Sequence, residues 1–163
     1  MITTELVKQL RDRTGISVMQ CKKALEETAG DIEKAIALLA QNSALIASKK
    51  GDRTLGAGVI TSYIHSTGNV GTMVELLCET DFVAKNEEFK SLARDIAMHA
   101  TATNPQYLKM EDMTEGGQPE EVLLNQAFIK NPEMTITNLI EGAIQKFGEK
   151  IELSRFVRYS VSE

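Results

Sequence analysis

The N-terminal segment of about 45 residues limits the possible folds most strongly, because it contains three short helical patterns in succession. Apolar residues recur at helical spacing in each pattern: Leu6, Val7 and Leu10; Val18, Cys21, Ala24 and Leu25; Ile32, Ala35, Ile36, Leu39 and Ala40. Ser17 and Asp31 are candidate N-caps, and Gly15 and Gly30 are candidate helix ends. Helices this short do not persist singly, so we expect them to pack together as a miniature bundle.

Two β-rich runs follow a polar, glycine-containing stretch at residues 48–58, which is the expected linker. The runs cover residues 59–65 and 70–79, and the Gly68-Asn69 pair between them is a turn signal, so they predict a hairpin. In the second run, apolar residues alternate with charged ones: Val74, Leu76 and Cys78 against Glu75 and Glu79. That alternation is typical of a sheet with one covered face.

Helical patterns after Asn86 supply a cover for this sheet. Two apolar stripes have helical spacing: Phe89, Leu92, Ala93, Ile96, Ala97 and Ala100; and Leu139, Ile140, Ala143, Ile144 and Phe147. A weaker helix is expected between the Gly/Pro-containing stretch at 114–119 and about Lys130.

The last run, residues 151–161, alternates Ile151, Leu153, Val157, Tyr159 and Val161 with polar residues. It predicts a strand with one apolar face that returns to pair with the hairpin. The predicted fold class is therefore α+β. An N-terminal three-helix module over residues 1–50 precedes a small antiparallel β-sheet core, backed by helices, over residues 51–163.

Composition narrows the classes of partner. The formal net charge is -5 and the basic residues are scattered, which disfavours nucleic-acid binding. No apolar run is long enough to span a membrane, and the N-terminus has the pattern of neither a signal nor a transit peptide. Cys21 and Cys78 are too few for a disulfide framework and lie in apolar patterns. We therefore expect buried free thiols and a reducing, cytoplasmic location.

No pattern for bond-making chemistry is present. The Gly56-Ala57-Gly58 run lacks the helix and lysine of a phosphate-binding loop. His65 and His99 have no cysteine or acidic partner at ligand spacing, and no nucleophile–base signature occurs. We expect no metal, no cofactor and no enzymatic activity.

Three segments carry a resemblance to a known family. TGISVMQCKKAL at residues 14–25 continues into GDIE at 30–33, ETDFVAKNEEF lies at 79–89, and KIELSRF lies at 150–156. In this order and spacing they resemble the elongation factor Ts family, whose N-terminal part is similar to a ubiquitin-associated module. The resemblance extends from one end of the chain to the other and rests mainly on the first two segments.

The resemblance implies a guanine nucleotide exchange factor for elongation factor Tu in protein synthesis. It implies that Thr80, Asp81, Phe82 and Val83 meet the partner, where Phe82 enters a pocket of the nucleotide domain and the magnesium and phosphate site is disturbed. Partner-facing positions in the helical module are, by the same resemblance, Arg13, Met19, Lys22 and Lys23. Short family members with one core unit are expected to form homodimers.

The residues alone leave other interpretations open. Asp81 is then a turn or capping residue and Phe82 a core anchor, while Met19 packs in the core and Lys22 and Lys23 form a solvated helix face. Two other functions also remain. A ubiquitin-binding module would use the loop around Gly15-Ile16, and a structural assembly protein would use the core only to dimerise.

Overall fold

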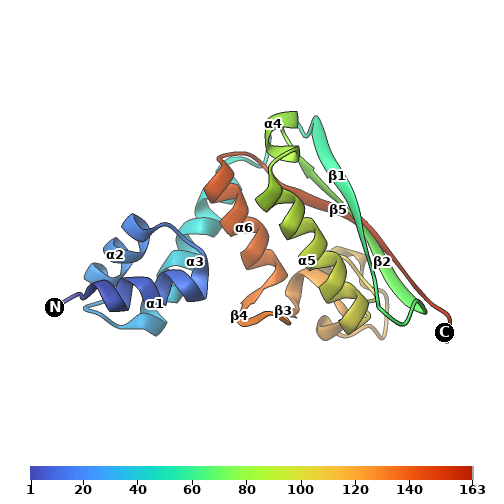
Figure 1. Ribbon diagram of the computed structural model, residues 1–163, viewed down its shortest axis with the longest axis horizontal. Helices are drawn as coiled ribbons and strands as arrows, with labels where there is room; N and C mark the ends of the chain where they lie inside the picture. The colour runs from blue at the N-terminus through green and yellow to red at the C-terminus, as the bar shows by residue number, and fades with distance from the viewer. Residues whose placement is uncertain (163) are drawn as a thin grey trace.

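The computed structural model describes residues 1–162 and confirms the α+β fold (Figure 1). The helices are α1 (Thr4–Thr14), α2 (Val18–Glu27), α3 (Ile32–Lys49), α4 (Asp81–Ala84), α5 (Glu87–Thr103) and α6 (Ile136–Phe147). The strands are β1 (Ala57–Ile64), β2 (Val70–Cys78), β3 (Ala127–Phe128), β4 (Asn131–Thr135) and β5 (Glu152–Ser160). Three 3₁₀ turns, η1 (Met110–Asp112), η2 (Pro119–Glu121) and η3 (Leu123–Asn125), lie between α5 and β3.

The three predicted N-terminal helices are confirmed, and so are the caps Gly15, Ser17 and Asp31. Ser17 and Asp31 accept hydrogen bonds from backbone N–H groups three residues on, and Gly15 ends α1 at a φ of 69° that suits glycine. α2 ends at Glu27, ahead of Gly30, and α3 continues to Lys49. The linker is therefore shorter than expected. The buried residues of this bundle are Val7, Leu10, Cys21, Ala24, Leu25, Ala35 and Leu39, a cluster separate from the core beyond the linker.

The main sheet has the strand order β1-β2-β5, and all its pairs are antiparallel. The hairpin is confirmed, with Gly68 at a φ of 72° in its turn. The predicted return of the last strand is confirmed too, because β5 pairs with β2 from Val70 to Leu77. Val74, Leu76 and Cys78 are buried, as their alternation predicted.

A β-bulge corrects the single apolar face expected for residues 151–161. Leu153 pairs with Leu76 but Arg155 pairs with Glu75, so Ser154 is an extra residue on β5. The extra residue reverses which side the following residues face. Leu153 is buried against the helices, whereas Tyr159 lies on the opposite, outer face and is 77% exposed. The prediction of a single apolar face assumed a continuous pleat, and the bulge interrupts the pleat.

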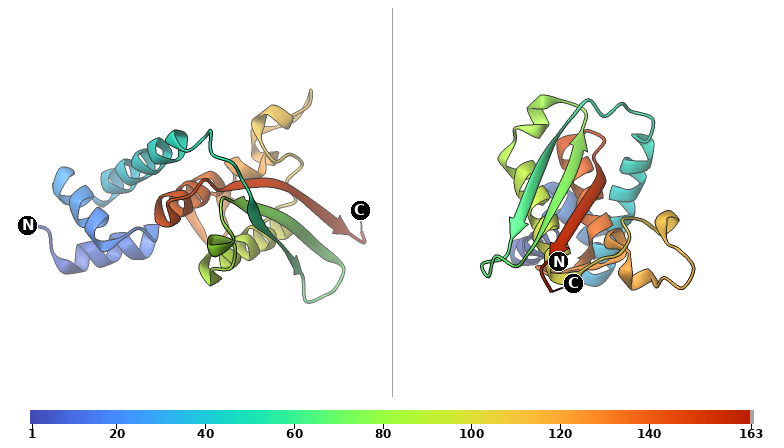
Figure 2. Two further views of the ribbon diagram at one scale, coloured as in Figure 1. Left: turned by 90° about the horizontal axis from the view of Figure 1, so that it is seen from above. Right: turned by 90° about the vertical axis from the view of Figure 1, so that its right-hand side faces the viewer.

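Helices α5 and α6 cover one face of the sheet and leave the other face open (Figure 2). Phe89 and Ile96 of α5 are fully buried beneath the sheet. Phe89 also meets Phe147 of α6 edge-on, at a centroid distance of 6.2 Å. α6 in turn packs on α3, which joins the helical bundle to the core (Figure 1).

The weaker helix expected up to Lys130 is wrong. This stretch consists of 3₁₀ turns and the short β3–β4 pair. α5 ends at Asn104, which takes a left-handed conformation, and Leu123 is a buried anchor whose N–H donates to the Tyr107 carbonyl over 2.8 Å. Buried His99 holds the stretch from α5: its Nδ1 accepts from the Ile129 N–H over 3.2 Å. Long-range contacts therefore replace the local helical pattern.

Candidate partner-binding site

The turn after β2 presents the central residues of the predicted site. α4 is a single helical turn, and Thr80 is its N-cap, accepting from the Val83 N–H over 3.4 Å. Asp81 follows the cap and is exposed, so it lies in the first turn rather than at the capping position. Val83 and Ala84 are buried beneath the turn. The turn is thus anchored to the core on the side of Val83 and Ala84, and its opposite side is exposed to solvent.

Phe82 is 85% exposed at the top of this turn. The interpretation of Phe82 as a core anchor is therefore wrong, and Val83, which is 4% exposed, has that place instead. A large aromatic side chain that is exposed to solvent on an anchored turn is available for burial in another molecule.

Three of the four candidate residues in the helical bundle are exposed on α2. Met19 is 81% exposed, so its interpretation as core packing is wrong, and Val18 beside it is 53% exposed. Lys22 and Lys23 extend into solvent and approach Glu26 and Glu27 one turn later, at 3.9 and 4.0 Å. Such pairs contribute little to stability, which leaves both ammonium groups available to a partner.

Arg13 lies in the last turn of α1, not on α2. Its guanidinium contacts Glu33 of α3 at 2.8 Å and also forms an ion pair with Glu133 of β4. These hydrogen bonds raise the pKa of Arg13 further above its ordinary value, and the Arg13 hydrogen bond lowers the pKa of Glu133. The side chain of Arg13 therefore joins the bundle to the core.

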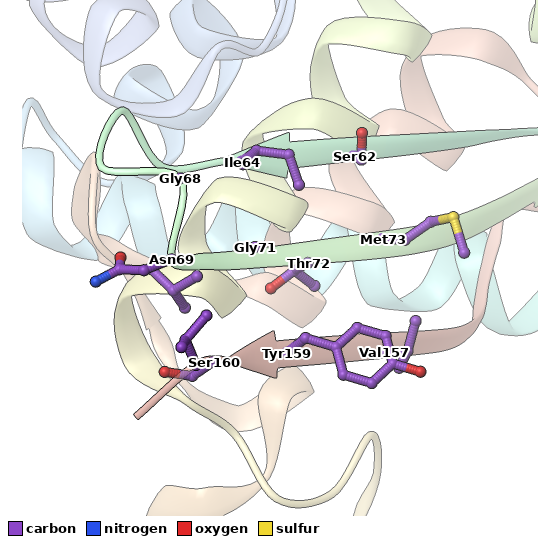
Figure 3. Close-up of a pocket in the computed structure, with 12 residues that line it drawn as sticks. Ser62, Ile64, Gly68, Asn69, Gly71, Thr72, Met73, Val157, Tyr159 and Ser160 are labelled. Carbon is purple, nitrogen blue, oxygen red and sulfur yellow. The ribbon is translucent and has the colours of Figure 1, made fainter. Parts of the chain in front are cut away.

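The outer face of the sheet contains a feature that the sequence analysis missed. Five large apolar side chains on it are exposed and define a surface that we call the outer apolar face: Ile60, Ile64, Met73, Tyr159 and Val161. Ile64, Met73, Val157 and Tyr159 come from three adjacent strands around a depression of about 530 Å³ (Figure 3). The alternation of Ile60, Ser62 and Ile64 in β1 was a usable signal, but the contribution of β5 depends on the bulge at Ser154.

No group of three or more His, Cys, Asp or Glu side chains within residues 1–162 is placed to hold a metal ion. None of the helices described is long and apolar enough to cross a membrane. Both thiols are free and buried, as predicted, and burial raises the pKa of Cys21 and of Cys78.

Comparison with known proteins identifies the family. The family described as Elongation factor TS matches residues 2–117. The chain is 43% identical to elongation factor Ts of Carboxydothermus hydrogenoformans, over 100% of this chain and 90% of the relative. It is 44% identical to that of Thermodesulfovibrio yellowstonii, over 99% and 97%, and 42% identical to that of Thermosipho melanesiensis, over 100% of both.

The alignments also show how this chain differs from its relatives. The alignment with the Carboxydothermus hydrogenoformans relative spans 196 positions, whereas this chain has 163 residues. The relative therefore carries internal residues that have no counterpart here. The family match ends at residue 117, within the stretch of 3₁₀ turns between α5 and β3. With matches of this identity over its full length, the chain belongs to the elongation factor Ts family.

Proposed function

We propose that this chain is a guanine nucleotide exchange factor for elongation factor Tu that acts in protein synthesis in the cytoplasm. The observation that carries the proposal is Phe82, an exposed aromatic side chain on an anchored turn in a member of the elongation factor Ts family. Phe82 enters a pocket of the partner's nucleotide domain, and Asp81 accompanies it. Thr80 and Val83 contribute by shaping and anchoring the turn.

The energetics require more than this one side chain. Burial of one phenylalanine contributes about 1.5–3 kcal/mol, which is part of what is needed to loosen the magnesium and phosphate contacts that hold GDP. The remainder comes from a second contact made by Met19, Lys22 and Lys23 on α2. Arg13 supports that contact by holding the bundle against the core.

The mechanism is one of coupled binding and needs no covalent step, metal or cofactor in this chain. If the factor weakens the binding of GDP, GDP weakens the binding of the factor by the same ratio. Incoming nucleotide therefore displaces the factor, which accelerates exchange in either direction. The excess of GTP in the cell then determines which nucleotide replaces GDP.

The test is the release of fluorescent GDP from elongation factor Tu after addition of excess unlabelled nucleotide. Catalytic amounts of this protein are expected to accelerate the release, with turnover of many partner molecules per molecule of factor. An unchanged rate with a matched partner from the same organism would refute the proposal. A titration with ubiquitin, followed by chemical shifts around Gly15 and Ile16, would then test the alternative use of the helical module.

We infer, in addition, that two copies of the chain associate through the outer apolar face. The centre of the face is apolar, while Glu75 and Arg155 form an ion pair at 3.0 Å beside it. Two sheets can pack face to face about 10 Å apart and bury such residues on both sides. A two-fold axis through the face would bring the same patch of both copies together, which suits a homodimer.

A further inference from the structure

The turn that carries Phe82 is too short to hold its own conformation. α4 has four residues, and an isolated helical turn of this length is unstable. Its cap hydrogen bond from the Val83 N–H to Thr80 Oγ1 is long, at 3.4 Å. Burial of Val83 and Ala84 holds the lower side of the turn. The order of the turn therefore depends also on contacts to the residues at its start.

Glu149 makes such contacts from a distant part of the sequence. It belongs to the segment between the end of α6 and the start of β5, and this segment lies at the same end of the core as α4 (Figure 1). Its Oε1 accepts from the backbone N–H groups of Glu79 and Thr80 over 3.1 and 3.0 Å. Its Oε2 accepts from the Thr80 hydroxyl over 2.6 Å. Both carboxylate oxygens are thus used to hold the entry to the turn, with bonds of the stronger, charge-assisted kind.

The Thr80 hydroxyl connects Glu149 to the turn itself. It donates to Glu149 and at the same time accepts from the Val83 N–H. Because its hydrogen is committed to the carboxylate, the oxygen lone pairs are directed to the turn. Glu149 therefore fixes the rotamer of the residue that caps α4.

Glu79 provides a second, reciprocal contact between the same two segments. Its Oε1 accepts from the Lys150 N–H over 2.7 Å and from Arg53 of the linker at 3.3 Å. Glu149 thus holds residues 79–80, while Glu79 holds residue 150. Two crossed contacts fix the orientation of the segments as well as their separation, which one contact could not do.

We propose that Glu149 is a positioning residue for nucleotide exchange: its carboxylate orders the Thr80–Val83 turn so that Phe82 is presented before the partner arrives. This role rests on the proposed function of the chain. Without the carboxylate, the turn samples other conformations, and only a fraction of the molecules is competent to bind. The apparent dissociation constant for the partner rises by the inverse of that fraction.

The first test compares Glu149→Ala and Glu149→Gln with Glu152→Ala, an exposed glutamate three residues further on. Fluorescent GDP release is measured over a range of factor concentrations. Glu149→Ala is expected to raise KM roughly tenfold or more, with most of kcat retained, because partner binding can still select the ordered turn. Glu149→Gln keeps the shape of the side chain and loses its charge, so its KM is expected to fall between the values of wild type and Glu149→Ala. The KM of Glu152→Ala should match wild type.

Amide hydrogen exchange of the free protein gives a readout that needs no partner. Faster exchange confined to residues 79–84 and 149–151 in Glu149→Ala supports the role. The Thr80→Val variant should raise KM similarly, and the double variant should add little, since both remove the bond between the Thr80 hydroxyl and Glu149 that connects the carboxylate to the turn. A wild-type KM, or a lowered melting temperature with unchanged KM and evenly faster exchange, would overturn the proposal. If wild-type protein itself fails to release GDP, the proposed function is refuted, and the presentation role with it.

Discussion

The guanidinium of Arg13, at the end of α1, donates from Nε to Oε2 of Glu133 in β4 over 2.7 Å. The same junction has two further hydrogen bonds: Asn131 Nδ2 donates to the Arg13 carbonyl over 2.7 Å, and Ser43 Oγ donates to Gln145 Oε1 over 2.6 Å. The helical bundle, which has its own buried cluster, is thereby held at one orientation to the core. Under the proposed function, this orientation sets where Met19 lies relative to Phe82.

Arg13→Ala is expected to slow nucleotide exchange several-fold while both hydrophobic clusters stay folded, because the bundle loses its fixed orientation and the two contacts no longer act together. Glu133→Gln should have a similar effect, and the double variant little more than either single one. Lys8→Ala, on the exposed side of α1, is the control. Exchange rates of the single and double variants provide the check, and additive effects in the double variant would show that Arg13 and Glu133 act separately. The rates are measured at low and high salt, because salt screens exposed charges.

Phe82→Ala is expected to retain the fold and lose most exchange activity. The side chain is exposed in the free protein, so its removal leaves no cavity. Loss of about 1.5–3 kcal/mol of burial in the complex corresponds to a decrease in kcat/KM of roughly ten- to a hundredfold. Stopped-flow release of fluorescent GDP measures the activity, and thermal melting checks the fold. Exchange at the wild-type rate would eliminate the role of Phe82.

Met73→Glu is expected to weaken self-association of the chain by tenfold or more. Met73 lies at the centre of the outer apolar face, and a carboxylate buried there between two copies would have no partner. Ser66→Glu places the same charge in the exposed hairpin turn and should leave the dimer intact. Sedimentation velocity over a dilution series measures both, and a wild-type chain that is monomeric at all concentrations would refute the dimer.

Stability is expected to fall below about pH 6.5 because of His99. Burial lowers the pKa of His99, and its Nδ1 accepts a hydrogen bond that protonation would remove. The folded-state pKa thus lies below the unfolded one, so the contribution is complete above the unfolded pKa and is lost as the pH falls towards the folded one. The slope approaches about 1.4 kcal/mol per pH unit.

Urea denaturation between pH 7.5 and 5.5 measures this slope for wild type, His99→Gln and His65→Gln. The slope should disappear in His99→Gln and persist in His65→Gln, which removes the exposed histidine at the end of the hairpin strand. An unchanged slope in His99→Gln would assign the pH dependence to other groups.

Both thiols are expected to react slowly with aromatic disulfide reagents in the native protein. Cys21 and Cys78 are fully buried, and burial raises the pKa of each, so little thiolate is accessible. In denaturant, both should react at the rate of a model thiol. A rapid phase of thiol reaction in the native protein would show that the surroundings of one cysteine open. Separately, self-association of the chain that is lost on reduction would show a disulfide between two copies.

Local patterns in the sequence were sufficient for most of the fold. Caps such as Ser17 and Asp31, the Gly68 turn and the alternation around Leu76 depend on neighbours within a few residues, so the sequence displays them directly. The same holds for the position of the Phe82 turn between a strand and a helix. The expected helix before Lys130 failed because long-range contacts of Leu123 and His99 outweigh a weak helical preference.

The sequence by itself determined which elements form, their order, and the motif that contains Phe82. Tertiary structure alone decided which side chains meet the solvent on the Phe82 turn and on the β5 part of the outer apolar face. Whether Phe82 or Val83 is the buried anchor depends on how the turn sits on the core, and the outward side of Tyr159 depends on one extra residue at Ser154. Glu149 and Thr80 are joined only because β5 returns beside β2. The physical reason is that exposure at these positions, strand register and hydrogen bonds between distant residues arise from tertiary packing, which the local patterns here do not encode.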